Sequence, residues 1–454
     1  MITQLQKLKI CLLLVTGLTT NTFSQSWQTV GQVGFSVGEV YYPMLAMNSI
    51  GQPYVAFKDV ANSGKATVMK FNGTNWEIVG TAGFSIDFIH MISLAFNNIN
   101  EPYVAYQDNA NLGKITVMKF NGTNWEIVGT AGFSQGLAGY LALAFNNNEP
   151  YVAYTDGGNT QKATVMKFNG TSWVTVGSAG FSIGTVSDIS LAFSKTGEPY
   201  VAYEDYSNLN RATVMKFDGT NWVNVGPSTG FSTGMAAYTS LAFSNGNEPY
   251  VAYRDWANSQ KATVMKYNGT DWVNVGLAGF SQGMASYTSL AFSNNDEPYV
   301  AYIDWANSYK TSVMKYNGTS WGNVGVAGFS DGYTGFSTLE FDNTGVPYVA
   351  YMDNSIPQNK ATVKKFVNSA SVNELHNSIT VIYPNPVKDI LNIEVSNMVK
   401  PSEKINVKIV DVSGKVFLTH QLQTGSNVID ISMLSSGTYF IKNEQGSSVK
   451  FIKK

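Results

Sequence analysis

Residues 101–129 read EPYVAYQDNANLGKITVMKFNGTNWEIVG, and variants of this stretch recur about every 49 residues between residues 27 and 368. The whole unit reads W-x-x-V-G-x-x-G-F-S, then S-L-A-F, then E-P-Y-V-A-Y-x-D, and then K-A-T-V-M-K-F-N-G-T. Its tryptophans are Trp27, Trp76, Trp125, Trp173, Trp222, Trp272 and Trp321. A repeat of this length predicts a solenoid, a propeller or another array of like units.

The incomplete last copy distinguishes between these architectures. Six copies end in Asn-Gly-Thr or Asp-Gly-Thr and continue into a tryptophan strand, whereas the seventh ends at residues 365–368 without one. An unmatched tryptophan strand, Ser26 to Gly31, precedes the first copy. A closed ring requires this combination, because the first strand can complete the last unit and remove its open edge. We therefore expect residues 26–31 to pair beside residues 360–366.

Each unit contains four short alternating segments, for example residues 93–96, 102–106, 114–120 and 124–129. Aromatic and β-branched residues favour strands, and Asn121-Gly122 between the last two segments is a strong hairpin signal. No segment of the repeats has a helical period. The repeats therefore predict an all-β fold, a seven-bladed β-propeller over residues 25–368 closed by its N-terminal strand.

Residues 1–24 have the order of a secretory signal peptide. Lys7 and Lys9 precede the apolar residues 10–15, a run too short to cross a bilayer, and small residues follow. The single cysteine, Cys11, lies inside this segment, so the mature chain is expected to lack disulfides. No transmembrane segment is expected elsewhere in the chain either. The net charge of -2 and the absence of a basic stripe argue against a nucleic-acid partner.

A different pattern follows a Ser/Asn-rich linker at residues 369–379. Residues 380–454 contain short alternating strands, which predict a small β-sandwich. Their motifs are Tyr383-Pro384-Asn385-Pro386, a Ser-Gly turn at Gly414, the sequence Gly437-Thr438-Tyr439, and a basic tail. This segment resembles the type A C-terminal sorting domain of the type IX secretion system of Bacteroidetes. The resemblance implies that the secretion machinery is a partner and that the protein is secreted or held at the outer-membrane surface.

The repeats themselves resemble secreted bacterial propellers built on L-A-F and P-Y-V-A-Y-x-D units. They do not match the W-D, kelch or sialidase signatures. This resemblance implies a fold, and function must be argued from the site, since propellers host enzymes, lectins and scaffolds.

Catalytic chemistry is weakly supported. His90 is the only histidine of the repeats and is interpreted as a connector residue, and no nucleophile and base can be assembled. Four acidic candidates, Asp87, Asp188, Glu204 and Asp331, are scattered among the units. We therefore expect no enzyme, no metal site and no cofactor.

One aspartate ends the second segment of every unit. A residue present in every unit is expected to be structural, so we interpret each as capping its own turn, helped by the next Asn and by a Lys or Arg six or seven residues on. These residues are Asp59, Asp108, Asp156, Asp205, Asp255, Asp304 and Asp353, followed by Lys65, Lys114, Lys162, Arg211, Lys261, Lys310 and Lys360. The repeated tryptophans and the Gly-Phe-Ser triplets are interpreted as packing elements in the same way.

Function is expected where the copies differ. The turns after the second segment carry Tyr206, Trp256 and Trp305, where other copies have Val, Asn or Gly. An indole between Asp and Asn suits stacking on a sugar, so these three residues are the candidate ligand-binding set. Tyr238 and Tyr287 are expected in the adjacent connectors, where they extend this surface or bury it. The predicted function is an exported, non-catalytic binding or adhesion propeller for glycans or surface proteins. A packing role for the indoles, a glycan-active hydrolase or lyase, and a structural matrix protein stay open as alternatives.

Overall fold

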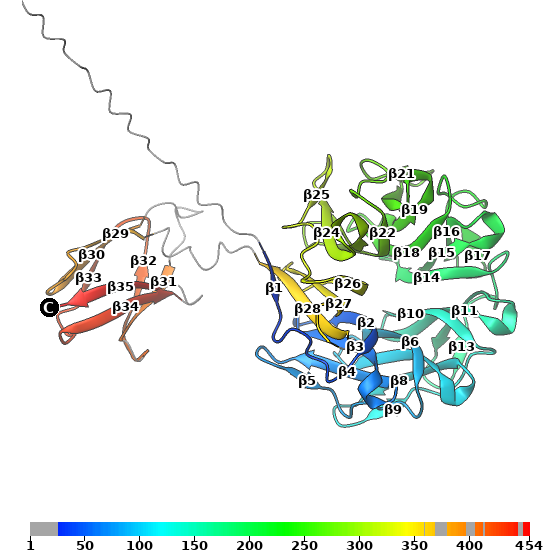
Figure 1. The fold of residues 1–454 in the computed structure, drawn as a ribbon, viewed down its shortest axis with the longest axis horizontal. Helices are drawn as coiled ribbons and strands as arrows, with labels where there is room; N and C mark the ends of the chain where they lie inside the picture. Colours follow the sequence, from blue (N-terminus) through cyan, green and yellow to red (C-terminus); the bar gives the residue numbers. More distant parts are fainter. Residues whose placement is uncertain (1–25, 358, 368–378, 396–404, 412–413, 444–447) are drawn as a thin grey trace, which may run out of the picture. The chain divides into compact units, whose positions relative to one another are not determined.

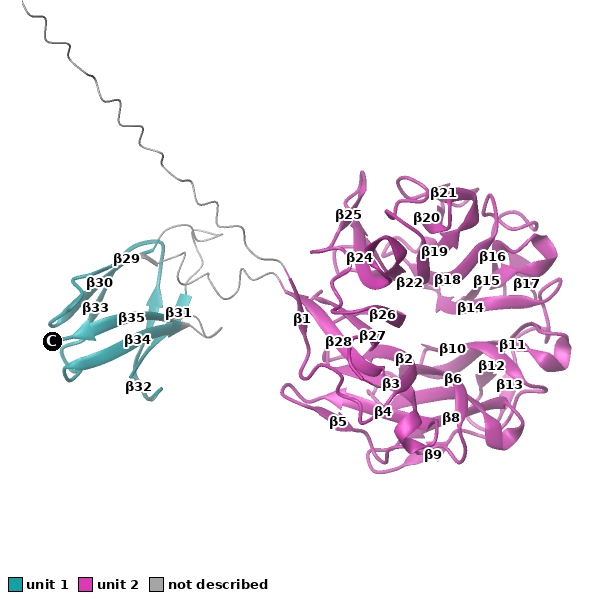
Figure 2. Ribbon diagram, in the orientation of Figure 1, with its two compact units in different colours: residues 1–25, 368–454 teal, residues 26–367 magenta. Residues whose placement is uncertain are grey.

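The computed structural model describes residues 26–357, 359–367, 379–395, 405–411, 414–443 and 448–454. The predicted signal peptide, and all of the predicted linker except residue 379, lie outside these ranges. Two compact units are present, one of residues 26–367 and one containing the C-terminal strands (Figure 2). Among the described residues, no helix has both the length and the apolar character needed to cross a membrane.

Residues 26–367 form repeated four-stranded antiparallel sheets that follow one another around a common centre in a propeller-like arrangement (Figure 1). The first three sheets contain β2 (Val40–Met47), β3 (Pro53–Asp59), β4 (Lys65–Phe71) and β5 (Trp76–Ile78); β6 (Ile89–Phe96), β7 (Pro102–Asp108), β8 (Lys114–Phe120) and β9 (Trp125–Ile127); and β10 (Ala138–Asn146), β11 (Glu149–Asp156), β12 (Lys162–Phe168) and β13 (Trp173–Thr175). The next three contain β14 (Val186–Phe193), β15 (Pro199–Asp205), β16 (Arg211–Phe217) and β17 (Trp222–Asn224); β18 (Ala236–Phe243), β19 (Pro249–Asp255), β20 (Lys261–Tyr267) and β21 (Trp272–Asn274); and β22 (Ala285–Phe292), β23 (Pro298–Asp304), β24 (Lys310–Tyr316) and β25 (Trp321–Asn323). The all-β prediction is confirmed.

The last sheet combines both ends of the repeat region. It contains β26 (Thr334–Phe341), β27 (Pro347–Asp353), β28 (Lys360–Val367) and β1 (Ser26–Thr29). Strand β1 pairs antiparallel with β28, and Trp27 lies opposite Phe366. The pairing expected for the first strand is therefore present.

A stacked Trp–Phe pair joins each sheet to the preceding one. The Trp76 ring stacks on Phe35 at 4.1 Å, and its Nε1 donates to the Val30 carbonyl at 2.8 Å. The same two contacts recur for the tryptophans Trp27, Trp125, Trp173, Trp222, Trp272 and Trp321. The serine of each Gly-Phe-Ser triplet also bonds the backbone, as Ser85 does with the Ala66 N–H. The packing interpretation of both motifs is thus confirmed.

Short 3-10 turns follow the second strand of the first six sheets. They are η1 (Val60–Asn62), η2 (Asn109–Asn111), η3 (Gly157–Asn159), η4 (Tyr206–Asn208), η5 (Trp256–Asn258) and η6 (Trp305–Asn307). The innermost strands are longer than the Ser-Leu-Ala-Phe core predicts, because each continues past a β-bulge to the end of its neighbour. In the fourth sheet the register shifts between Ser187 and Ser190.

The C-terminal unit contains two antiparallel sheets around one apolar core. One sheet contains β29 (Ile379–Tyr383), β30 (Ile390–Val395) and β33 (Gly425–Asp430), and the other β32 (Val416–Leu422), β31 (Ile405–Asp411), β34 (Gly437–Asn443) and β35 (Ser448–Lys453). Fully buried Leu391 and Ile393 of the first sheet pack with Ile409, Ile441 and Phe451 of the second. Alternating strands thus bury one face of each sheet.

Candidate ligand-binding face

The aspartate that ends each second strand is a structural residue. Asp108 accepts hydrogen bonds from the Ala110 N–H at 3.1 Å, from Asn111 at 2.8 Å and from Thr116 at 2.6 Å. The Asp–Thr or Asp–Ser contact recurs in every sheet. The expected help from the following Lys or Arg is wrong, since no ion pair joins these residues in the part of the chain that the structure describes. A β-strand hydroxyl eight or nine residues on takes that place.

The three predicted ligand-binding residues each begin a 3-10 turn and are exposed. Tyr206, Trp256 and Trp305 retain 51%, 46% and 36% of their accessible surface. The turn positions are set by the buried aspartates before them, which hold the same geometry in sheets that lack an aromatic residue there. The turn itself therefore does not require the indoles.

Arg254, one of the last residues of β19, lies over both indoles. Its guanidinium carbon is 5.5 Å from the ring centre of Trp256 and 5.5 Å from that of Trp305, within cation–π range. Trp305 Nε1 donates to the Ser286 hydroxyl at 3.1 Å, and its ring lies 4.9 Å from that of Tyr309. The structure thus brings the two predicted tryptophans, from neighbouring sheets, into one cluster around an arginine.

A second group of aromatic residues lies at the bulges of the innermost strands. Tyr42, Tyr140, Tyr238, Tyr287 and Phe336 occupy equivalent positions, with φ between 38° and 56°. Bulky residues rarely adopt this left-handed conformation, and here the bulge redirects their side chains. We call these five residues, together with Asp188 at the same position of β14, the collar.

The collar side chains approach one another from different sheets. Ring centres are 4.5 Å apart for Tyr42 and Phe336, 4.7 Å for Phe336 and Tyr287, and 4.6 Å for Tyr287 and Tyr238. Burial raises the pKa of Tyr287 to about 12, with smaller contributions from Tyr238, Tyr42, Asp188 and Tyr140. Side chains of several innermost strands therefore converge. The sequence placed Tyr238 and Tyr287 in connectors; both lie in strands instead.

Asp188 of the collar lies near a second acidic residue, Glu204 of the adjacent strand β15. Burial raises the pKa of Asp188 to about 6, the nearby Glu204 carboxylate adds to this, and the hydrogen bond from the Tyr238 N–H opposes it. Glu204 is buried and accepts from Ser187 and Asn210, each at 2.7 Å. Burial likewise raises the pKa of Tyr140 to about 12, helped by Asp188, Tyr206 and Glu204. The expectation that the acidic candidates are scattered is wrong for this pair, because β14 and β15 are adjacent strands of one sheet.

The other chemical candidates are separate from this cluster. Asp87 accepts from Asn109 at 2.6 Å and from the Phe88 N–H at 2.8 Å, and Asp331 pairs with Lys364 at 3.4 Å. His90 lies in β6, so its interpretation as a connector residue is wrong. Within the described ranges, no group of three or more His, Cys, Asp or Glu side chains is arranged to hold a metal ion.

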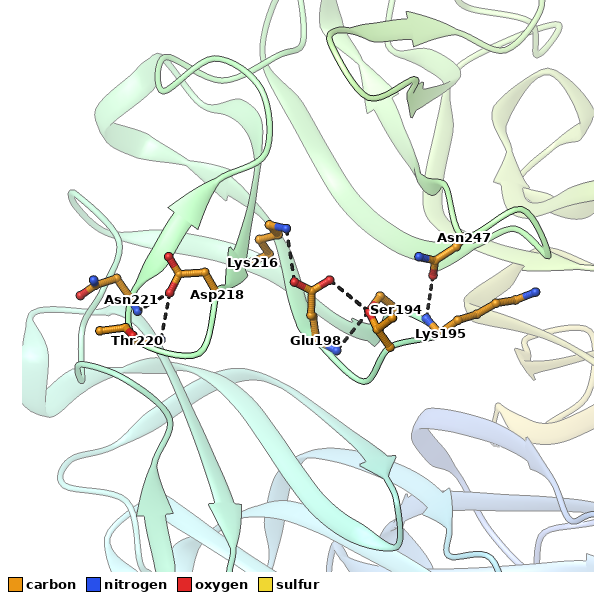
Figure 3. A network of polar contacts seen from close by, with 9 residues as sticks. Ser194, Lys195, Glu198, Lys216, Asp218, Thr220, Asn221 and Asn247 are labelled. Carbon is orange, nitrogen blue, oxygen red and sulfur yellow. Dashed lines mark hydrogen bonds and ion pairs between the residues drawn. The ribbon is translucent and has the colours of Figure 1, made fainter.

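Polar contacts recur where the first strand of a sheet connects to the second. Glu198 pairs with Lys216 at 3.3 Å, and the Glu198 N–H donates to Ser194 (Figure 3). The Lys195 N–H donates to Asn247 of the next sheet at 2.6 Å (Figure 3). Equivalent Lys–Glu pairs occur in four further sheets. Since these contacts repeat, they mark the architecture rather than a single site.

The motif residues of the C-terminal unit have two different environments. Residues 383–386, Tyr-Pro-Asn-Pro, are exposed, and Asn385 accepts from the Ile452 N–H at 3.0 Å. Gly414 has φ 87° and closes the turn between β31 and β32 by donating to Asp411. Gly437 begins β34, and buried Tyr439 donates to the Ser435 carbonyl at 3.0 Å. The first motif thus belongs to the surface, whereas Tyr439 of the last motif belongs to the core.

Comparison with protein families supplies the meaning of these motifs. Residues 381–454 match the family described as the secretion system C-terminal sorting domain. The chain carries a type IX secretion sorting domain. The sorting domain makes the type IX machinery a partner, and the protein is secreted or displayed at the outer-membrane surface. Curated protein sequences gave no match.

Solved structures resemble the chain at low similarity. A protein of unknown function from Dyadobacter fermentans has 10% identity, with 75% of this chain and 97% of that chain covered, and a TM-score of 0.44. The lectin of Aleuria aurantia in complex with Fucalpha1-6GlcNAc has 15% identity, 65% and 99% coverage, and a TM-score of 0.44. The alpha-L-arabinanase of Penicillium chrysogenum has 11% identity, 76% and 98% coverage, and a TM-score of 0.43.

Proposed function

We propose that residues 26–367 form a closed seven-bladed β-propeller that binds glycans outside the cell and is not an enzyme. The binding residues are Trp256 and Trp305, with Tyr206 beside the collar as a further contact. Export by the sorting domain puts this face among extracellular and surface polysaccharides.

Contacts between the last sheet and the first support closure. The Leu45 N–H of β2 donates to the Thr338 hydroxyl of β26 at 3.1 Å. The same hydroxyl-to-leucine contact links other consecutive innermost strands. Trp76 of the first sheet also donates to Val30, which directly follows the β1 segment. The last and first sheets are thus joined as other neighbours are.

The observation that carries the binding proposal is the exposure of two indoles that the 3-10 turns do not need. The equivalent turn residues Asn109 and Gly157 support the same capped geometry without an aromatic ring. Exposing the apolar surface of an indole to water is unfavourable, and a bound ligand removes that surface from water. Aromatic rings also stack on the apolar face of a sugar. The presence of both exposed rings around one arginine supports a ligand at this place.

A glycan array tests this proposal with the chain from residue 25 to 454. The comparison variant is Trp256→Asn/Trp305→Asn, since Asn109 and Asn354 occupy the equivalent positions. Affinity should fall by about one to two orders of magnitude, as for aromatic residues at interface hot spots, and the melting temperature should change little. Binding that survives unchanged in the double variant, or the absence of any bound glycan, contradicts the proposal. Capture of a surface protein by the same residues would support the binding face but replace the ligand.

A glycan-active enzyme is the second candidate, and the Asp188–Glu204 pair is the observation that favours it. A carboxyl group with a pKa of about 6 can donate and accept a proton near neutral pH. Paired carboxylates are the usual groups of glycoside hydrolysis. Release of reducing ends from a polysaccharide, abolished by Asp188→Asn, would establish this function over simple binding.

A further inference from the structure

Arg254 occupies a position at which the repeats differ most in charge. The residue before the capping aspartate is Lys58, Gln107, Thr155, Glu204, Arg254, Ile303 or Met352. The backbone register is the same at each, so these side chains leave the sheet at equivalent places. The fold of the repeat therefore does not require an arginine at this position, and the role of Arg254 must come from the residues around it.

The guanidinium of Arg254 has few hydrogen-bond partners. Within the described part of the chain, its hydrogen-bond partners are the Ser286 hydroxyl at 3.4 Å and the Met284 sulfur at 3.9 Å, and its buried Nε has none. No carboxylate among the described residues forms an ion pair with it. Glu204, at the equivalent position of the preceding sheet, bonds Ser187 and Asn210 instead. A buried donor on a charged group is costly to leave unmatched.

The indoles complete the environment of this cation. Trp256 and Trp305 each lie 5.5 Å from the guanidinium carbon and keep exposed surface for a ligand. They hold the arginine by cation–π contacts without using its N–H groups. Nη1 and Nη2 each carry a second N–H group beyond the bonds to Ser286 and Met284, and these two groups form a planar fork that matches the two oxygens of a carboxylate.

We propose that this cluster recognises the carboxylate of an acidic saccharide, a uronic acid residue, with Arg254 binding the carboxylate and the indoles contacting the sugar ring. This inference rests on the proposed glycan-binding function and names its ligand class. Arg254 would then determine specificity, while Trp256 and Trp305 would supply contact area to neutral and acidic sugars alike.

Calorimetry with the chain from residue 25 to 454 tests the assignment. The probes are a galacturonic acid trisaccharide, its methyl ester and a sulfated galactose trisaccharide. The methyl ester keeps the ring and removes the negative charge, so it is the matched ligand control. The affinity for the acid should be at least about ten-fold higher than the affinity for the ester. Added salt should lower the affinity for the acid only.

Variants of Arg254 test whether this residue determines ligand specificity or only supports the two indoles. Arg254→Gln and Arg254→Lys copy Gln107 and Lys58 of other repeats, so both should fold. Arg254→Gln should lose about ten- to hundred-fold in affinity for the acid and little for the ester. Arg254→Lys should restore part of the affinity, since it keeps the charge without the fork.

Three results would overturn the carboxylate assignment without refuting glycan binding. If the acid and the ester bind equally and binding still requires Trp256 and Trp305, the glycan-binding function stands and the carboxylate site is excluded. Tighter binding of the sulfated probe would show that the site recognises a sulfate group rather than a carboxylate. Equal losses for acid and ester in Arg254→Gln would show that the arginine only supports the indoles. Failure of all glycans to bind would refute the proposed function itself.

Discussion

The indole Nε1 of Trp27 donates a hydrogen bond of 2.8 Å to the carbonyl of Val324, 297 residues further along the chain. Its ring also stacks on Phe329 at 4.2 Å. Trp321 makes the same two contacts with Val275 and Phe280 within the continuous part of the repeat region. The first strand therefore supplies the last sheet with a packing element that every other sheet obtains from its own repeat.

Replacing Trp27 should destabilise the repeat unit as strongly as replacing a tryptophan inside it. Trp27→Ala and Trp321→Ala each remove a partly buried ring, a stacked pair and a hydrogen bond, a loss of about 3–5 kcal/mol. Denaturant midpoints of the two variants measure this loss. A midpoint unchanged in Trp27→Ala but lowered in Trp321→Ala would show that the N-terminal strand is dispensable.

Glu340→Ala should stabilise the protein above neutral pH. Six repeats have alanine at this position of the innermost strand, and burial raises the pKa of Glu340 to about 7 from an ordinary value of 4.5. A raised carboxyl pKa means that the folded state holds its proton longer, so stability is lost as pH rises through about 4.5 to 7. The gain in Glu340→Ala at pH 8 is at most about 3 kcal/mol.

Melting temperature measured between pH 4 and 8 checks this prediction. Ala291→Glu, which places the same group in the neighbouring sheet, is the matched control and should melt lower at pH 8 than at pH 4. A pH profile of Glu340→Ala that runs parallel to the parent chain would contradict the assignment of this slope to Glu340.

Asp188→Asn should reduce the loss of folding stability that the parent chain shows as pH rises from about 4 to 6. The pKa of Asp188 is raised from 3.8 to about 6, so the parent chain loses stability as pH rises through this interval, by at most about 3 kcal/mol. Asparagine removes the charge and keeps an acceptor for the Tyr238 N–H. Asp188→Ala, which lacks the acceptor, should be less stable than Asp188→Asn at every pH in a thermal melt. Equal stabilities would show that the hydrogen bond contributes nothing.

Removing residues 380–454 should stop export without unfolding the repeats. Residues 26–367 form their own compact unit with their own apolar clusters, and the sorting domain lies outside it. The truncated chain should accumulate in the periplasm, as fractionation and immunoblotting would measure, and it should melt cooperatively. Normal surface appearance of the truncated chain would be inconsistent with the sorting role.

The amino-acid sequence determined the repeat, its strands and the pairing of the first strand with the last sheet. Each depends on local pattern: alternation defines a strand, Asn-Gly a hairpin, and an unmatched Trp27 strand a missing edge. The sorting domain was equally readable, because its motifs, from Tyr383 to Tyr439, keep a recognisable order. Local pattern also predicted that Asp108 and its equivalents are structural and are bonded by the next Asn, although the Lys or Arg that it added as a second partner is wrong.

Only the tertiary structure brought the chemically distinct residues together. Arg254 meets Trp305 across two sheets, and Asp188 meets Glu204 because a bulge redirects the β14 side chains next to β15. The spacing of residues along the chain predicts neither contact. A bulge changes the direction in which a side chain points, and the packing of neighbouring sheets brings together residues about 50 positions apart. Repetition predicts what all copies share, whereas the contacts among the residues that differ depend on how the sheets pack.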